Sequence, residues 1–211
     1  NLISKILKTV KKLKDELNIH MDYISLGGGY GIPYTDEDSP LNFDNVFNNV
    51  AQNFNVFFES RHEAKPALWI EPGKSVVGDT GILLTRVTGK KDSYKSYIGV
   101  DAGMETLMRP ALYGAYHRIY KVGDPDALPS TKVDITGRIC ENTDRLAKDR
   151  LFPEVNEGDL LAVMDAGAYG FTMSNQFCTR PKVAEIFLAG EKPTLIRRRE
   201  TIKDILRSCD V

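Results

Sequence analysis

Residues 23–31 have the sequence YISLGGGYG, a short apolar run that ends in four glycines within five positions. This pattern predicts a buried strand followed by a tightly turning loop. Residues without Cβ let backbone N–H groups approach a bound anion closely, and such amide nests hold phosphate. The spacing is not that of GxGxxG, and no Gly-Lys-Ser/Thr follows. The loop alone therefore fits a phosphate site and a turn without a ligand equally well.

Helical and extended patterns alternate around this loop. Residues 1–18 and 43–60 have apolar side chains at helical spacing. Residues 67–70 form a second short apolar strand that ends at once in Glu71-Pro72-Gly73-Lys74. Helix, strand and loop in repetition are typical of a parallel α/β fold, in which ligands bind at the carboxyl ends of strands. We therefore expect both loops at the same end of the sheet.

A different pattern begins near residue 81. Short runs rich in β-branched and aliphatic residues are punctuated by Gly, Pro, Asp and Asn, and they cover residues 81–88, 94–100, 132–135, 160–164 and 184–188. They predict an all-β second domain, a β-sandwich or a β-barrel. The expected domains are residues 1–78 and 79–211.

The composition excludes several classes of protein. The 211 residues are 42% hydrophobic and carry a formal net charge of −1, which predicts binding to neither nucleic acid nor a membrane. No signal peptide is recognisable, and the lysines of residues 1–18 form either a solvated face or a surface for an anionic partner. Cys140, Cys178 and Cys209 form no Cys-x-x-Cys pair. This favours a reducing compartment, the cytoplasm, and argues against a zinc site.

Two side-chain pairs of the second domain can carry chemistry. Arg109 and Tyr113, four residues apart, can hold a carboxylate through a bidentate guanidinium and a phenol; ordinary surface packing is the alternative. Cys140 beside Glu141 can donate a proton, and a small buried hydrophobic side chain is the alternative there.

Several motifs in one order resemble a known family. They are LGGGYG at 26–31, EPG at 71–73, DAGM at 101–104, RPALY at 109–113, CE at 140–141, DAGAYG at 165–170 and RRRET at 197–201. Together they resemble the fold-type III decarboxylases that use pyridoxal 5'-phosphate, and within them the branch that acts on diaminopimelate. The resemblance covers the chain from about Asp22 to Leu206.

The resemblance implies a fold and an assembly. We expect residues 1–78 to be the last strands and helices of a cofactor-binding (β/α)8 barrel, of the TIM-barrel type, followed by the β-domain in 79–211. The enzyme is expected to be a homodimer with shared active sites that converts meso-diaminopimelate to L-lysine in amino-acid biosynthesis.

It also implies roles for individual residues. The cofactor-binding residues are expected to be Gly28, Gly29, Glu71, Gly73, Lys74 and Tyr169. The substrate-binding residues are expected to be Lys74, Arg109, Tyr113, Glu141 and Tyr169. Cys140 is expected to be the catalytic proton donor, and with Glu141 it would reach into the partner subunit's site.

Three departures from the family pattern bear on the substrate. Lys74 stands where the family usually has arginine, Asn142-Thr143 replaces Ser-Gly, and Phe177-Cys178 replaces a tyrosine-asparagine pair. A relative that acts on carboxynorspermidine, ornithine or arginine is therefore an alternative. The RPALY run favours diaminopimelate, which has a second carboxylate.

A complete barrel of this type takes about 250 residues, so residues 1–78 leave room for only its last two strands. No lysine of this chain matches the family's covalent cofactor anchor. We expect the chain to be a C-terminal fragment that is inactive alone. A non-catalytic, dimerising remnant is the other possibility.

Overall fold

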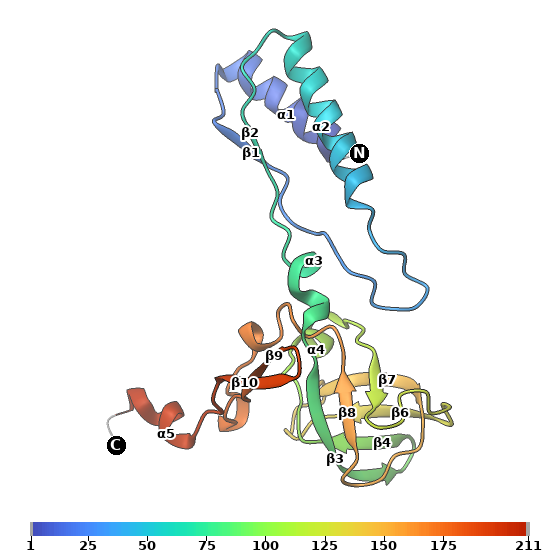
Figure 1. Ribbon diagram of the computed structural model, residues 1–211. Helices are drawn as coiled ribbons and strands as arrows, with labels where there is room; N and C mark the ends of the chain where they lie inside the picture. Colours follow the sequence, from blue (N-terminus) through green and yellow to red (C-terminus); the bar gives the residue numbers. More distant parts are fainter. Residues whose placement is uncertain (1, 210–211) are drawn as a thin grey trace. The chain divides into compact units, whose positions relative to one another are not determined.

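The structure is a computed structural model that describes residues 2–209. Two compact units divide the chain between Val76 and Val77, and each has its own hydrophobic core. Figure 1 shows two helices beside two short strands in the first unit and a curved sheet with a separate hairpin in the second. Among the described residues, no helix is both long and apolar enough to cross a membrane.

The first unit alternates helices with parallel strands. Its elements in chain order are α1 (Leu2–Leu17), β1 (Tyr23–Ser25), α2 (Phe43–Ser60) and β2 (Ala67–Trp69), and the short α3 (Lys74–Val77) follows. β1 and β2 pair in parallel, with Tyr23 opposite Ala67 and Ser25 opposite Trp69. The predicted parallel α/β arrangement is confirmed for these elements.

Both helices pack against one face of the β1–β2 pair (Figure 1). This core consists of Ile3, Leu7, Val10, Ile24, Leu26, Phe54 and Phe58. Burying one such side chain contributes roughly 1.5–3 kcal/mol, and an isolated helix of this length is marginal in water. The helices therefore depend on the strands for their stability. On the outer face of α1, Lys11 and Lys12 pair with Asp15 and Glu16, one turn further on.

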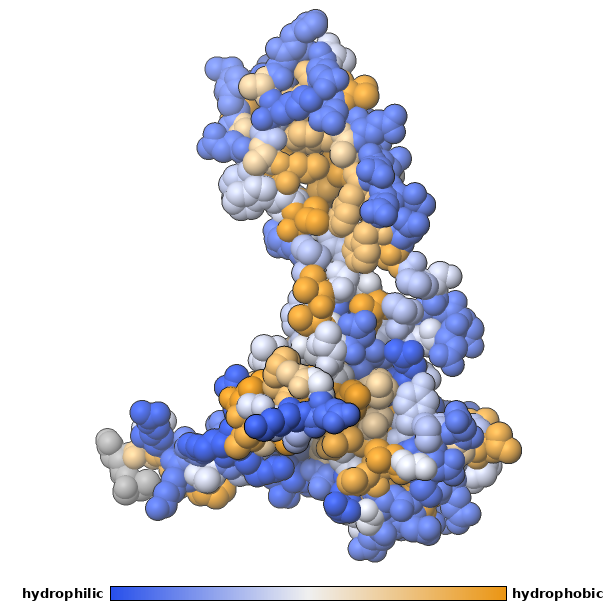
Figure 2. All heavy atoms as spheres, in the orientation of Figure 1, coloured by the Kyte–Doolittle hydropathy of each residue, from blue (hydrophilic) through white to orange (hydrophobic). Residues whose placement is uncertain are grey.

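The other face of the strand pair carries two exposed aromatic rings. Tyr23 and Trp69 are each 53% exposed, and they stack with their ring centroids 4.3 Å apart. Figure 2 shows further apolar side chains at the surface of this unit. Parallel sheets are normally covered on both faces, so an uncovered aromatic pair on this face is unusual.

The second unit is built on a six-stranded mixed sheet in the order β5-β8-β3-β4-β6-β7. Its strands are β3 (Leu83–Asp92), β4 (Ser96–Val100), β5 (Ile119–Lys121), β6 (Thr131–Thr136), β7 (Arg145–Phe152) and β8 (Leu160–Val163). β4 and β6 are parallel. Residues 83–86 of β3 pair with β8, and residues 87–92 pair with β4, with a bulge between Val87 and Gly89. Because bulges bend strands and increase their twist, the sheet curls into a half-barrel.

Every strand of this sheet contributes to the core of the second unit. The most deeply buried side chains include Val100, Ile135, Leu146, Leu161 and Val163, each at most 1% exposed. The sequence predicted a sandwich or a barrel, and the structure has one curved sheet with the core on its concave side. The separate hairpin consists of β9 (Glu185–Ala189) and β10 (Lys192–Arg197), which pair antiparallel.

Three strands, β5, β7 and β10, have no counterpart in the predicted set. β5 has only three residues. β7 has the charged sequence RLAKDRLF, and its register shifts against β6, so adjacent residues Leu146 and Ala147 are both buried. β10 is exposed along its whole length and contains Pro193. None of the three has the alternation of apolar and polar residues from which a strand is predicted.

Candidate functional site

The two strand-end loops of the first unit lie at the same end of the strand pair, as predicted, and the structure shows that they also contact each other. Leu26 N donates to Trp69 O at 2.9 Å and Glu71 N donates to Gly27 O at 3.0 Å, so the ladder of β1 and β2 continues into the loops. The Ser25 hydroxyl donates to Glu71 Oε1 at 2.6 Å and accepts from Gly27 N at 3.0 Å. One serine thus connects both loops through its side chain.

The glycine loop has no room for a side chain at the point where it comes closest to the second loop. A Cβ on Gly28 would lie 2.8 Å from Glu71 O. Gly27 and Gly29 have φ of 70° and 90°, in the left-handed region that favours glycine. No group among residues 2–209 accepts a hydrogen bond from the N–H of Gly28 or Gly29. Adjacent unpaired N–H groups form a concavity suited to an anion.

The second loop adds a cation and a hydroxyl. Lys74, half-buried, begins the four-residue α3 directly after Gly73. The Ser75 hydroxyl is buried and has no hydrogen-bond partner within the described residues. Because buried polar groups in proteins are normally paired, this orphaned hydroxyl fits a site whose polar ligand is not part of the chain.

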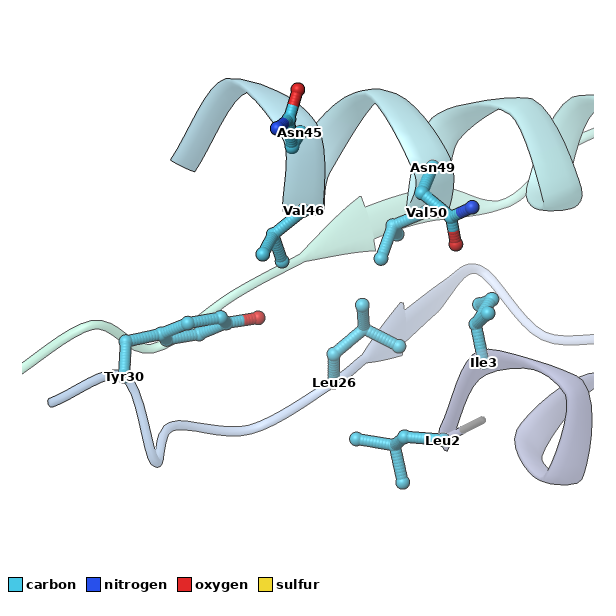
Figure 3. A pocket seen from close by; sticks show the side chains of 8 residues that line it. All are labelled: Leu2, Ile3, Leu26, Tyr30, Asn45, Val46, Asn49 and Val50. Carbon is cyan, nitrogen blue, oxygen red and sulfur yellow. The ribbon is translucent and has the colours of Figure 1, made fainter. Parts of the chain in front are cut away.

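A separate pocket of about 440 Å³ lies between α1, α2 and the segment after β1. Figure 3 shows Val46 and Val50 of α2 directed toward Leu26 and Ile3. The complete lining is Leu2, Ile3, Leu26, Tyr30, Asn45, Val46, Asn49 and Val50. It contains aliphatic and amide groups and no cation, so it does not fit an anionic ligand.

In the second unit, a buried histidine fixes Arg109. Arg109, 7% exposed, begins α4 (Arg109–Tyr113), and its Nη1 lies 3.0 Å from His117 Nε2. A guanidinium only donates, so Nε2 accepts, and the Nδ1–H donates to Met164 O at 2.8 Å. Burial, with the charge of Arg109, lowers the pKa of His117 and favours the neutral ring. Tyr113, at the other end of α4, is 66% exposed.

Tyr169 lies in a strained turn after β8. Tyr169 and Asp165 have φ of 57° and 61°, values that non-glycine residues rarely adopt. Arg118 holds Asp165 through both carboxylate oxygens at 3.0–3.2 Å. A Cβ on Gly170 would lie 2.2 Å from Ala166 O. These contacts define the backbone on which the half-exposed Tyr169 ring is placed.

The turn with Cys140 is held by a buried carboxylate. Asp144, 3% exposed, accepts from Met104 N at 2.7 Å and from Ile139 N at 3.0 Å. Burial, and then the nearby charge of Glu105, raise the pKa of Asp144. Asp144 therefore joins two loops in the way that Ser25 does in the first unit.

Cys140 and Glu141 do not form an isolated pair. The Glu141 carboxylate accepts from both N and Oγ1 of Thr143, each at 3.1 Å. Desolvation, and then the charge of Cys140, raise the pKa of the Cys178 thiol. One departure from the family pattern, Thr143, thus binds the neighbouring Glu141 carboxylate at this turn.

Residues 18–167 match the family described as pyridoxal-dependent decarboxylase, C-terminal sheet domain. The chain belongs to this decarboxylase family. It is 41% identical to a diaminopimelate decarboxylase of Methanothermobacter thermautotrophicus over 99% of this chain and 49% of that protein. It is 42% identical to a diaminopimelate decarboxylase of Archaeoglobus fulgidus over 91% of this chain and 45% of the relative. The chain thus spans about half the length of these curated relatives.

Solved structures agree with this membership. A diaminopimelate decarboxylase from M. jannaschii in complex with L-lysine covers all of the chain at a TM-score of 0.84 and 32% identity, and the chain covers 47% of it. The Helicobacter pylori enzyme with L-lysine has a TM-score of 0.77 and 33% identity, with 98% of this chain and 50% of that chain covered.

The residues for which the family resemblance implies a role divide between the two units. The first unit contains Gly28, Gly29, Glu71, Gly73 and Lys74, and it brings the glycine loop into contact with Glu71. The second unit contains Arg109, Tyr113, Cys140, Glu141 and Tyr169. Their individual roles stay predictions.

Four further residues belong to the loops and turns described above, although the sequence predicted no role for them. They are Ser25, Ser75, His117 and Cys178. Only Cys178 had a signal in the sequence, because it departs from the family pattern.

The lowered pKa of His117 predicts a pH dependence of stability. In the unfolded chain His117 titrates near its ordinary pKa of about 6.5, and the folded protein binds that proton only at lower pH. The contribution of His117 to the free energy of unfolding is therefore fully present above about pH 6.5. It is lost as the pH drops, by at most about 1.4 kcal/mol per pH unit. We expect His117→Gln to remove this part of the pH dependence.

Urea unfolding between pH 7.5 and 5.5 gives the free energy of unfolding of each protein and its slope against pH. The effect is the difference in this slope between the variant and the parent. His20→Gln, at an exposed position, is the matched control and should keep the parental slope. Equal slopes for His117→Gln and the parent would contradict the prediction.

Proposed function

We propose that the protein containing this chain decarboxylates meso-diaminopimelate to L-lysine with pyridoxal 5'-phosphate. The supporting observation is the contact of the two strand-end loops. The N–H groups of Gly28 and Gly29 have no acceptor among the described residues, and the second loop ends at the half-buried Lys74. Identity of 41% to a diaminopimelate decarboxylase over nearly the whole chain supports the substrate. Two similar structures contain L-lysine, the product of this reaction.

The first unit fits the phosphate group of the cofactor. The N–H groups of Gly28 and Gly29 would donate to phosphate oxygens, and the loop from Glu71 to Gly73 would close the other side. Lys74 adds positive charge without the planar fork of an arginine. The Tyr169 hydroxyl would donate a further hydrogen bond to the cofactor or the substrate. The bound cofactor supplies an electron-accepting ring for the loss of carbon dioxide.

The second unit supplies groups for the substrate. Arg109 has the donor geometry for a carboxylate, and His117 fixes its orientation. Tyr113 lies one helical turn away on α4 and can add a phenol. Diaminopimelate has a second carboxylate for such a pair, whereas ornithine has none. Glu141 can bind the distal ammonium group of the substrate.

The first unit also fits a (β/α)8 barrel. Its helices cover one face of β1 and β2, and the stacked rings of Tyr23 and Trp69 occupy the other. In a closed barrel the second face points to the interior, which side chains fill. We place residues 1–78 in such a barrel and residues 79–211 in the following β-domain, in a protein of the cytoplasm.

The proposed reaction predicts a preference among substrates. The complete protein with pyridoxal phosphate should release carbon dioxide from meso-diaminopimelate in preference to ornithine, arginine and carboxynorspermidine, because only diaminopimelate has a second carboxylate for Arg109. Residues 1–211 alone should release none, since no lysine here matches the cofactor anchor. Carbon dioxide release and lysine formation are measured side by side. Preference for another of these substrates would refute the assignment of diaminopimelate.

The phosphate site predicts a contrast between two glycines. Gly28→Ala places a Cβ 2.8 Å from Glu71 O, whereas a Cβ on Gly31 meets nothing within 4 Å. Losing one hydrogen bond to a charged group costs about 1.5–3 kcal/mol, so Gly28→Ala should weaken cofactor binding in the complete protein about tenfold or more. Gly31→Ala should bind like the parent.

Equilibrium dialysis with pyridoxal phosphate gives both dissociation constants, and urea unfolding identifies any loss of stability. Equal affinities for the two variants would place the phosphate elsewhere.

We further propose that Cys140 donates its proton in the partner subunit's site of a homodimer. Mixing Cys140→Ala with Gly28→Asp, whose added carboxylate repels phosphate, should then restore activity. Each heterodimer has one site that combines an intact phosphate loop with an intact thiol. Activity is measured after reversible dissociation and reassociation, with each variant alone as the control. Verified heterodimers without activity would show that Cys140 does not act across the interface.

A further inference from the structure

The half-buried Glu141 side chain is held by Thr143, two residues further along the chain. The backbone N–H and the hydroxyl of Thr143 both donate to Glu141 Oε1, each at 3.1 Å. Within residues 2–209, Oε2 of the same carboxylate accepts no hydrogen bond and pairs with no cation. Two donors on one oxygen therefore fix the direction of the carboxylate and leave its other oxygen open.

Other hydrogen bonds fix the backbone of this turn. Asp144 N donates to Glu141 O at 3.0 Å, and Arg145 N donates to Thr143 O at 2.7 Å. On the other side of the turn, the buried Asp144 carboxylate accepts from Ile139 N at 3.0 Å. None of these bonds involves the Thr143 hydroxyl. Removing that hydroxyl would therefore leave the turn in place and release only the Glu141 carboxylate.

The Thr143 hydroxyl has one proton and two neighbours that can accept it. Met104 Sδ lies 4.0 Å from Thr143 Oγ1, whereas Glu141 Oε1 lies 3.1 Å from it. A thioether is a weak acceptor, and hydrogen bonds to charged groups are shorter and stronger than those between neutral groups. The proton therefore goes to the Glu141 carboxylate.

This hydroxyl is a departure from the family pattern, which has glycine at position 143. A glycine would keep the backbone N–H and would lose the hydroxyl. Thr143 is not among the residues with positive φ, so the backbone at this position does not require glycine. The threonine thus adds a second donor to Glu141 without straining the turn.

We propose that Thr143 is a positioning residue, which holds Glu141 Oε1 so that the open Oε2 binds the ammonium group at the distal end of the substrate. This inference rests on the function proposed above, in which Glu141 binds that group. An ammonium group has three N–H donors and forms a charge-assisted hydrogen bond to a carboxylate oxygen. A carboxylate that is already oriented loses less freedom on binding, and such preorganisation raises the affinity.

L-lysine, which two similar structures contain, reports on this contact without turnover. Decarboxylation removes the carboxylate of the reacting end of diaminopimelate. The carboxylate that lysine keeps, and the ammonium group beside it, therefore come from the distal end. The compound 6-aminohexanoate is lysine without that ammonium group. A change that affects the binding of L-lysine and not of 6-aminohexanoate therefore acts on the contact with the distal ammonium group.

The test measures the dissociation constants of both compounds for the complete protein with pyridoxal phosphate, by isothermal titration calorimetry. Thr143→Val removes the hydroxyl and nearly keeps the shape of the side chain. We expect it to weaken the binding of L-lysine about three- to tenfold, the effect of one net hydrogen bond, and to leave the binding of 6-aminohexanoate unchanged. Thr143→Ser keeps the hydroxyl and should restore most of the affinity for L-lysine.

Two further variants complete the design. Thr131→Val makes the same change at an exposed position at the start of β6, and it should bind both compounds like the parent. Glu141→Ala removes the acceptor of the Thr143 hydroxyl. In that background Thr143→Val should weaken the binding of L-lysine no further, because residues that act through one contact have non-additive effects. Urea unfolding identifies any loss of stability in each variant.

Three outcomes would overturn the role of Thr143. They are unchanged binding of L-lysine in Thr143→Val, an equal loss for both compounds, and additive losses for Thr143→Val and Glu141→Ala. Each of them leaves the proposed function intact if the parent binds L-lysine and decarboxylates diaminopimelate. A parent that binds L-lysine and releases no carbon dioxide from diaminopimelate would refute the proposed function alone. A parent that does not bind L-lysine would refute both.

Discussion

The backbone hydrogen bond from Glu71 N to Gly27 O determines the geometry of the first unit's site. It extends the parallel ladder of β1 and β2 past the strand ends and brings two loops together. Any Cβ on Gly28 would meet Glu71 O, so the close approach requires glycine. The N–H groups of Gly28 and Gly29 stay open because the loop turns through left-handed conformations at Gly27 and Gly29.

In the second unit, buried acidic residues have the role that strand pairing has in the first. The Asp144 carboxylate accepts from Met104 N and Ile139 N. The Glu105 carboxylate accepts from Arg138 Nε, and the backbone oxygen of Glu105 accepts from Asn175 N. Irregular loops have few backbone partners of their own, so a buried acceptor can satisfy several N–H groups at once. The cost is a charged group in a desolvated place, which the raised pKa of Asp144 reflects.

The departures from the family pattern are not scattered over the surface. Thr143 binds the Glu141 carboxylate, and desolvation, with the charge of Cys140, raises the pKa of Cys178. Lys74 begins the helix that follows the second strand-end loop of the first unit. All three alter polar groups next to residues that the family resemblance marks as functional, while the half-barrel and its apolar core match the family fold. Changes at such positions affect chemistry more than folding.

By itself, the sequence determined the helices of the first unit, the parallel order of its strands, the glycine loop and the family. Helical periodicity and glycine spacing are local properties, and they are visible within a few residues. The tertiary structure alone decided the half-barrel, the strands β5, β7 and β10, and the Arg109–His117 pair. These depend on residues far apart in the chain, as with Ser25 and Glu71, which are 46 positions apart. Such contacts arise only when the chain buries its apolar side chains and its remaining polar groups must find partners.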